Sequence, residues 1–180
     1  MVVLAAQQKK LKTYNTKKVK NMRIYTTYFA NIRNLPDNVV PISITLKSPP
    51  GWAGAELKKL APPYQLLKTY KQSTMSINID KNDVYVYYIK RYFESVLSQL
   101  DPESVLSELE LLAEERYCGS DKDYDIALVC FESPVDFCHR HIVAEWLRWH
   151  GIKCEEYGRD KEYIREYNKL DYLKTIIDNK

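Results

Sequence analysis

The stretch that decides the fold runs from residue 124 to residue 131 and reads Tyr-Asp-Ile-Ala-Leu-Val-Cys-Phe. Residues 126–131 are all apolar, and polar residues bound them on both sides. An unbroken apolar run of this length is typical of a strand that is buried on both faces, as in the middle of a parallel sheet. We therefore expect this strand at the centre of the domain.

The residues after this strand predict a helix and a second strand. Residues 133–136 form a predicted loop, residues 139–150 a helix that Gly151 ends, and residues 152–157 a short strand. Strand, helix and strand in this order form a βαβ unit, whose two strands lie parallel. We therefore expect an α/β fold, a three-layer Rossmann-like domain with a mostly parallel sheet.

Upstream of this unit, the hydrophobic pattern predicts two more strands and several helices. Asp101 followed by Pro102 is typical of a helix start, because the carboxylate accepts hydrogen bonds from free backbone N–H groups and proline fits the first turn. We expect Gly119 to end that helix. The other expected elements are strands over 23–32 and 39–46 and helices over 56–60, 64–70, 84–100 and 161–180.

The chain carries its positive charge unevenly. Its net charge is only +3, but eight lysines and arginines precede the first acidic residue, Asp37. We expect residues 1–21 to be a basic, solvated arm, and residues 22–180 to be a single α/β domain with a C-terminal helix. Two further interpretations stay open: the arm contacts the phosphates of a nucleic acid, or it is an upstream extension and Met22 is the natural start.

Apolar segments and cysteines together indicate a cytoplasmic protein. No apolar run reaches the length of about 18 residues that a transmembrane helix needs. The apolar stretch behind Met1 is too short for the core of a signal peptide. Without a signal, the four cysteines are expected to be reduced thiols. We therefore expect no membrane partner, and the sequence makes no prediction of the oligomeric state.

Several side chains that are suited to catalysis or ligand binding lie close together between residues 130 and 140. Cys130 ends the predicted central strand, and open parallel sheets bind ligands at the carboxyl ends of their strands. Cys138, His139 and Arg140 stand where the next helix begins, and a helix N-terminus attracts anions and lowers the pKa of a nearby thiol. We expect Cys130, Cys138 and His139 to be catalytic. Arg140 offers a planar fork for phosphate or carboxylate, and Glu132 a carboxylate that orients a cation.

Two other interpretations compete with this one. Buried cysteines often serve only as small apolar residues, which would make Cys130 part of the core. A metal site is the second alternative, and its possible soft ligands are Cys130, Cys138, His139, His141, His150 and Cys154. No Cys-x-x-Cys or His-x-x-x-His pair is present, and His139 and His141 face different sides of a helix. We therefore expect neither a metal nor a cofactor.

Two motifs carry a resemblance to a known family. Residues 128–147 read Leu-Val-Cys-Phe-Glu-Ser-Pro-Val-Asp-Phe-Cys-His-Arg-His-Ile-Val-Ala-Glu-Trp-Leu, and residues 25–33 read Tyr-Thr-Thr-Tyr-Phe-Ala-Asn-Ile-Arg. The first resembles the hallmark of the domain-of-unknown-function 488 family, in which Cys-x-Glu ends a strand and Cys-His-Arg opens the next helix. The second resembles that family's first strand, and its phage and bacterial members often begin near the position of Met22.

The resemblance implies a Rossmann-like fold with a polar pocket. The residues that it assigns to this pocket are Arg33, Cys130, Glu132, Cys138, His139 and Arg140. Tyr28 and Asn31, from the first-strand motif, are further candidates for ligand binding. The family's usual Asp-x-Arg is replaced here by Asn31, Ile32 and Arg33. A role that depends on that carboxylate therefore does not carry over.

Taken together, these features predict a small cytoplasmic enzyme or sensor. Its ligand would be a small anionic, phosphate-bearing or nucleotide-like molecule, bound where Arg33 and Arg140 meet in an electropositive hollow beside the thiols. The sequence leaves open whether the protein is an enzyme. The alternative is a non-catalytic interaction protein, phage-encoded, that uses its basic arm or C-terminal helix to bind nucleic acid or another protein.

Overall fold

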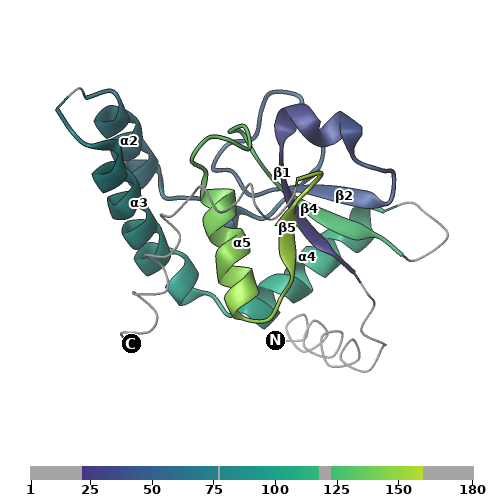
Figure 1. The fold of residues 1–180 in the computed structure, drawn as a ribbon. Helices are drawn as coiled ribbons and strands as arrows, with labels where there is room; N and C mark the ends of the chain where they lie inside the picture. Colours follow the sequence, from purple (N-terminus) through teal and green to yellow (C-terminus); the bar gives the residue numbers. More distant parts are fainter. Residues whose placement is uncertain (1–21, 77, 118–122, 160–180) are drawn as a thin grey trace, which may run out of the picture.

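The fold is a five-stranded sheet with helices packed against it (Figure 1). The computed structural model describes residues 22–76, 78–117 and 123–159. The strands are β1 (Ile24–Tyr28), β2 (Val39–Ser43), β3 (Ala55–Glu56), β4 (Asp125–Cys130) and β5 (Cys154–Glu156), in the spatial order β3-β2-β4-β1-β5. All the pairings between these strands are parallel. The predicted α/β fold with a parallel sheet is therefore confirmed.

Both α-helices and 3-10 helices connect these strands. The α-helices are α2 (Tyr64–Thr74), α3 (Lys81–Ser95), α4 (Pro102–Arg116) and α5 (His139–Trp149), and the 3-10 helices are η1 (Phe29–Asn34), η2 (Lys58–Leu60) and η3 (Leu97–Gln99). In the described part of the chain, none of these helices has both the length and the apolar character that crossing a bilayer requires.

Strand β4 is central because its side chains are apolar on both faces. All of its residues are buried, and Ile126 and Leu128 have no exposed surface. Ile126 lies in register with Ile24 of β1 on one side and with Val40 of β2 on the other. The apolar run in the sequence therefore correctly predicts the middle of the sheet.

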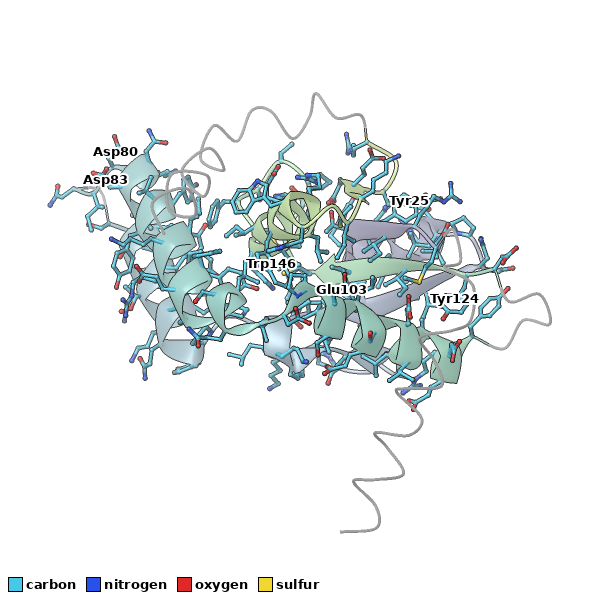
Figure 2. All side chains as sticks on the ribbon, turned by 90° about the horizontal axis from the view of Figure 1, so that it is seen from below. Tyr25, Asp80, Asp83, Glu103, Tyr124 and Trp146 are labelled. Atoms are coloured by element: carbon cyan, nitrogen blue, oxygen red, sulfur yellow. The ribbon has the colours of Figure 1, made fainter. Side chains whose placement is uncertain are left out.

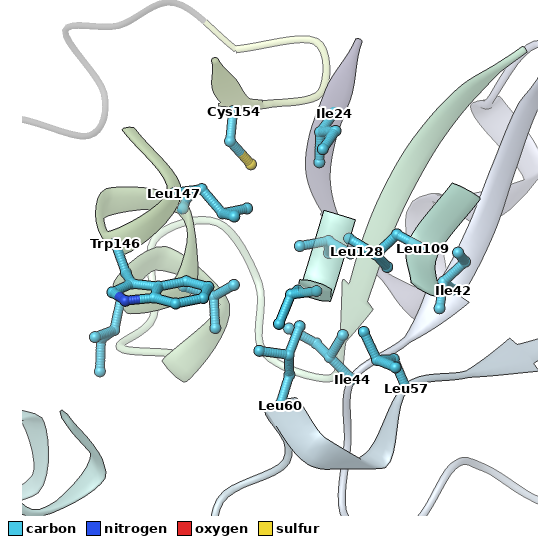
Figure 3. Close-up of a cluster of buried hydrophobic side chains, with 14 of the residues drawn as sticks. Ile24, Ile42, Ile44, Leu57, Leu60, Leu109, Leu128, Trp146, Leu147 and Cys154 are labelled. Atoms are coloured by element: carbon cyan, nitrogen blue, oxygen red, sulfur yellow. The ribbon is translucent and has the colours of Figure 1, made fainter. Parts of the chain in front are cut away.

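Helices α4 and α5 lie on the same face of this sheet. The chain passes from β3 to β4 and from β4 to β5 in one direction, and right-handed crossovers in one direction place their helices on one face. Leu109 of α4 and Trp146 of α5 belong to the same core cluster as Leu128, which Figure 3 shows in close-up. The connection from β1 to β2 runs the other way, which places η1 over the opposite face.

The helix pair α2 and α3 extends from one side of the sheet. Asp80 accepts a hydrogen bond from the Asn82 backbone N–H (2.7 Å) and begins α3 as its N-cap. Figure 2 shows Asp80 and Asp83 at the end of this pair that lies away from the sheet. Asp101 begins α4 in the same way, by accepting from the Ser104 N–H at 2.8 Å, as the sequence predicts.

The structure corrects the predicted ends of the first two strands. The first ends at Tyr28 rather than residue 32, because residues 29–34 turn into η1. Asn31 Nδ2 donates to Thr27 Oγ1 (3.0 Å), which holds η1 against the strand it follows. The second ends at Ser43 rather than residue 46, where a hydrogen bond between the Ser43 and Ser48 hydroxyls (2.7 Å) curls the chain.

Helix boundaries also differ from the prediction. The helix expected over 84–100 begins at Lys81 and ends at Ser95, and η3 continues it. The helix expected over 56–60 is replaced by the end of β3 and by η2. Helix α2 continues to Thr74, four residues beyond its expected end. Because helix ends depend on tertiary contacts, periodicity alone fixes them poorly.

Some sequence predictions fall outside the described residues. These are the basic arm over 1–21 and the C-terminal helix over 161–180. Cys118 also lies in a part of the chain that the structure does not describe. Helix α4, expected to end at Gly119, already ends at Arg116.

Truncating a side chain of the central strand tests the core. Leu128→Ala is expected to lower the free energy of unfolding by about 2–5 kcal/mol, because it leaves a cavity where no surface is exposed. Urea denaturation measures the loss. Leu111→Ala on α4 is the control, since Leu111 is 42% exposed and should cost less than about 1 kcal/mol. Equal losses in the two variants would contradict the central position of β4.

Candidate functional site

The candidate site lies at the carboxyl end of β4, where three segments meet. Cys130, the last residue of β4, is in register with Tyr28, the last residue of β1. The chain leaving β2 remains close, because the Ile44 N–H donates to the Val129 carbonyl (3.1 Å). Helix α5 begins beside this edge, with Cys138 as its N-cap residue. This is the edge at which open parallel sheets bind their ligands.

Four side chains form what we call the thiol cluster: Cys130, Glu132, Cys138 and His139. The Cys130 and Cys138 thiols each donate to the same oxygen of Glu132, Oε2, at 3.1 Å. Cys130 Sγ lies 3.5 Å from His139 Nδ1. The two sulfurs and a His139 ring nitrogen are all within 4.8 Å of one another. The end of β4 and the start of α5 therefore lie side by side, as the sequence predicts.

The ring of His139 is held from its opposite side. Its Nε2 lies 3.0 Å from the Ile44 carbonyl oxygen, which only accepts hydrogen bonds. In the neutral imidazole the proton is therefore on Nε2, and the lone pair of Nδ1 faces Cys130. Tyr92 of α3 packs edge-on against the ring, with centroids 5.6 Å apart, while its hydroxyl donates to the Leu60 carbonyl (2.5 Å).

Burial and hydrogen bonding set the ionisation of the cluster. Burial raises the pKa of Glu132, but the hydrogen bonds from Cys130 and Cys138 outweigh it, so the pKa lies below its ordinary value. Burial, reinforced by Cys130, raises the pKa of the Cys138 thiol well above its ordinary value. Burial lowers the pKa of His139, but its contacts with Cys138 and the Ile44 carbonyl raise it overall. At neutral pH, Glu132 is therefore ionised and Cys138 is a neutral thiol.

The structure corrects the ligand-binding role predicted for Arg140. This side chain has no exposed surface, and its Nε and Nη2 donate to the two oxygens of Glu156 on β5, at 3.2 and 3.1 Å. Its Nη1 donates to the Glu132 carbonyl (2.7 Å). Glu156 also accepts from the Thr26 hydroxyl (2.5 Å) and lies 3.6 Å from His141 Nε2. The guanidinium of Arg140 therefore binds groups within the fold, and it has no exposed surface with which to contact a ligand.

The candidates from the first-strand motif lie apart from Arg140. Arg33 is exposed on η1, whereas Arg140 is buried, so the predicted hollow in which both guanidinium groups meet is not formed. The Asn31 side chain bonds Thr27 and accepts from Asn34 (2.9 Å). Tyr28 is half-buried beside Cys130. Of these three, Tyr28 is the one that the register places next to the thiol cluster.

An aromatic patch beside the cluster is a feature that the sequence analysis missed. Phe29 contacts Phe131 (ring centroids 4.8 Å apart) and Trp52 (5.3 Å). Phe131 directly follows Cys130 and is 49% exposed. Phe29 begins η1, whereas Trp52 and Phe131 lie on loops. Trp52 after Pro-Pro-Gly is the clearest signal that the sequence offers for this patch.

Trp52 also lines a pocket of about 460 Å³ on the β3 side of the sheet. Its other charged and polar lining residues are Lys47, Ser48, Glu56, Lys58 and Arg116. Lys58 pairs with Glu56 at 2.8 Å, and Lys47 and Arg116 add two further positive charges, so the lining carries a net positive charge. Through Trp52, Phe29 and Phe131, this pocket is connected to the end of β4.

Phe137 anchors the loop that carries the thiol cluster from β4 to α5. Its ring stacks on Tyr85 (centroids 4.5 Å apart) and contacts Tyr70 and Tyr88 at 5.5 and 5.4 Å. Helices α2 and α3 therefore pack against this loop and fix Cys138. Tyr70, Tyr85 and Tyr88 therefore also support the site.

Comparison with known proteins gives one match. The family model described as the active DUF488-N3 subclade matches residues 9–151, which is well over half of the chain. The matched segment contains the whole thiol cluster and begins before Met22. No curated protein and no solved structure matches the chain.

Removing the partner of Arg140 tests the buried ion pair. Glu156→Gln is expected to lower the free energy of unfolding at neutral pH by about 3–5 kcal/mol, because it leaves a buried cation uncompensated. Urea denaturation measures the loss. Glu155→Gln on the same strand is the control: its carboxylate pairs with Lys153 at 3.8 Å near the surface, and its removal should cost less than about 1 kcal/mol. A similar loss in both variants would argue against the pair.

Acid is expected to remove the same stabilisation. Burial raises the pKa of Glu156, but His141 and Arg140 outweigh it and lower the pKa from 4.5 to about 2. A carboxylate with a depressed folded-state pKa stabilises the fold above its unfolded-state pKa, and this stability is lost as the pH falls through the folded-state pKa. The free energy of unfolding should therefore drop by about 3 kcal/mol as the pH falls from neutral to about 2. In Glu156→Gln, urea denaturation at the same pH values should show a smaller drop.

Proposed function

The chain belongs to the DUF488 family, in its N3 subclade, and we propose that it is a small enzyme or sensor for a phosphate-bearing or nucleotide-like molecule. The observation that carries this proposal is the thiol cluster at the carboxyl end of β4. Two thiols, an imidazole and a carboxylate are costly to bury together, and such groupings concentrate at functional sites. A core built only for stability would place apolar side chains there.

In this proposal, Cys130, Cys138 and His139 form the catalytic centre. Cys130 supplies a polarisable sulfur, and the Nδ1 of His139 lies 3.5 Å away, where it can exchange a proton with that sulfur. Glu132 accepts hydrogen bonds from both thiols and so holds them in place. Arg140 is a positioning residue, because it fixes the Glu132 backbone and the first turn of α5.

The aromatic patch of Phe29, Trp52 and Phe131 supports a ligand with a planar ring. Exposed aromatic faces stack on nucleobases, and each such contact contributes about 1–3 kcal/mol. Positive charge for a phosphate comes from exposed Arg33 and from the cationic pocket beside Trp52, in place of Arg140. Tyr28 and Asn31, at the end of β1, complete the proposed ligand-binding set.

The interaction-protein alternative stays a prediction. It depends on the basic arm and on the C-terminal helix, and both lie outside the described residues.

Thermal unfolding with a panel of nucleotides tests the ligand class. A nucleotide at a hundred times its dissociation constant should stabilise the protein by about 2.7 kcal/mol, which shifts the unfolding midpoint by several degrees. Phe131→Ala should weaken binding about tenfold, because it removes an exposed stacking face. Val135→Ala, on the same loop and 67% exposed, is the matched control. A panel without any response would overturn the proposal.

Charge removal on η1 tests the phosphate contact separately. Arg33→Ala should reduce the shift for nucleotides and leave the shift for the corresponding nucleosides unchanged, because only the nucleotides carry phosphate. Arg91→Ala is the control, since Arg91 is exposed on α3 and paired with Glu94 at 3.2 Å. Equal effects of the two variants would remove Arg33 from the site.

A further inference from the structure

We propose that Cys130, Cys138 and His139 bind a divalent metal ion of the zinc type. The two sulfurs and a nitrogen of His139 lie within 4.8 Å of one another. With Zn–S bonds near 2.3 Å and Zn–N bonds near 2.0 Å, the sulfur-to-nitrogen edge of a coordination tetrahedron is about 3.5 Å long. The distance from Cys130 Sγ to His139 Nδ1 is 3.5 Å. Little movement is therefore needed for both atoms to contact one ion.

The imidazole is already oriented as a ligand. A metal-binding histidine usually donates its other ring N–H to a carboxylate or a backbone carbonyl, which fixes the tautomer. His139 Nε2 has such a partner in the Ile44 carbonyl at 3.0 Å. The lone pair of Nδ1 consequently points toward the sulfur of Cys130. Tyr92 keeps the plane of the ring from turning.

Glu132 holds the two thiols in place. Its Oε2 lies 3.1 Å from each sulfur, so the carboxylate faces the edge between the two thiols. Glu132 is not part of the group whose ligand atoms all lie within 4.8 Å of one another, so the ion would have three protein ligands. Thiols lose their protons when they coordinate a metal. A bound metal would therefore replace the two S–H groups that now donate hydrogen bonds to Glu132.

Charge balance also favours a divalent ion. Once a metal displaces the two thiol protons, the buried thiolates carry two negative charges beside the half-buried Glu132 carboxylate, which is unfavourable without compensation. Arg140 does not supply this compensation, because its charge is already paired with Glu156. A divalent ion compensates the two thiolates, whereas a monovalent ion compensates only one of them.

This inference differs from the ligand proposal and does not rest on it. Cys130 bound to metal is a metal thiolate rather than a free thiol, so metal content decides which chemistry the centre offers. The sequence analysis names these three residues among six possible soft ligands but expects no metal, because no closely spaced pair is present. The fold, and not the local spacing, brings Cys130 to Cys138 and His139. The two regions are a strand end and the start of the following helix.

Cobalt(II) titration of the full chain, freed of metal by chelation, tests the proposal. One equivalent should produce a thiolate-to-cobalt charge-transfer band and the intense visible bands of a tetrahedral site, and zinc should abolish both. Cys130→Ser and Cys138→Ser should lose most of the charge-transfer intensity, and His139→Gln should weaken binding at least about tenfold. Circular dichroism of each metal-free variant shows whether it is folded.

Cys154→Ser is the matched control. Cys154 is a buried thiol on β5 within the apolar core, so this variant should not change the spectrum. A wild-type chain without the charge-transfer band, or a band that survives in Cys130→Ser and Cys138→Ser, would overturn the proposal.

Alkylation of the wild-type chain gives a second readout that needs no variant. Zinc should protect Cys130 and Cys138 from iodoacetamide at least about tenfold, as located by mass spectrometry, and should leave the slow reaction of Cys154 unchanged. Equal alkylation with and without zinc would overturn the metal site. Metal binding without any nucleotide response would instead overturn only the proposed ligand.

Discussion

The ion pair between Arg140 and Glu156 is the interaction on which the rest of the site depends. One guanidinium ties the first turn of α5 to β5 through Glu156 and to the loop after β4 through the Glu132 carbonyl. Because Glu156 also accepts from Thr26, the pair reaches β1 as well. A buried pair contributes little net stability, but losing one partner is costly. Its main effect is therefore positional: the neighbours of Arg140 in the chain cannot move independently of the sheet.

Local sequence patterns predicted the scaffold, and they could do so because the causes are local. The apolar run of β4 and the Asp101 N-cap depend on neighbouring residues alone. The role of Arg140 could not be predicted in this way, because its partner lies on a different strand. A cationic residue at a helix start looks the same in the sequence whether it faces solvent or a buried carboxylate. The metal-ligand geometry was missed for the same reason, since it depends on how β4 and α5 meet.

The position of the thiol cluster follows from the topology of the sheet. Strand β4 ends between β1 and β2, and the chain segments after all three strands supply parts of the site: η1, the segment at Ile44, and the loop that leads to α5. Helices α2 and α3 close this loop from the side through Phe137. An all-parallel sheet therefore brings together, at one edge, side chains and backbone groups from segments that lie far apart along the chain.

The bond between His139 and Ile44 joins two regions that otherwise look separate. Ile44 precedes Leu46 by two residues, and Leu46 is the first residue that lines the pocket containing Trp52. The carbonyl that anchors the Nε2 of the imidazole therefore belongs to the same short backbone segment as the rim of the pocket. The orientation of the His139 ring thus depends on the path that this segment takes between β2 and the pocket.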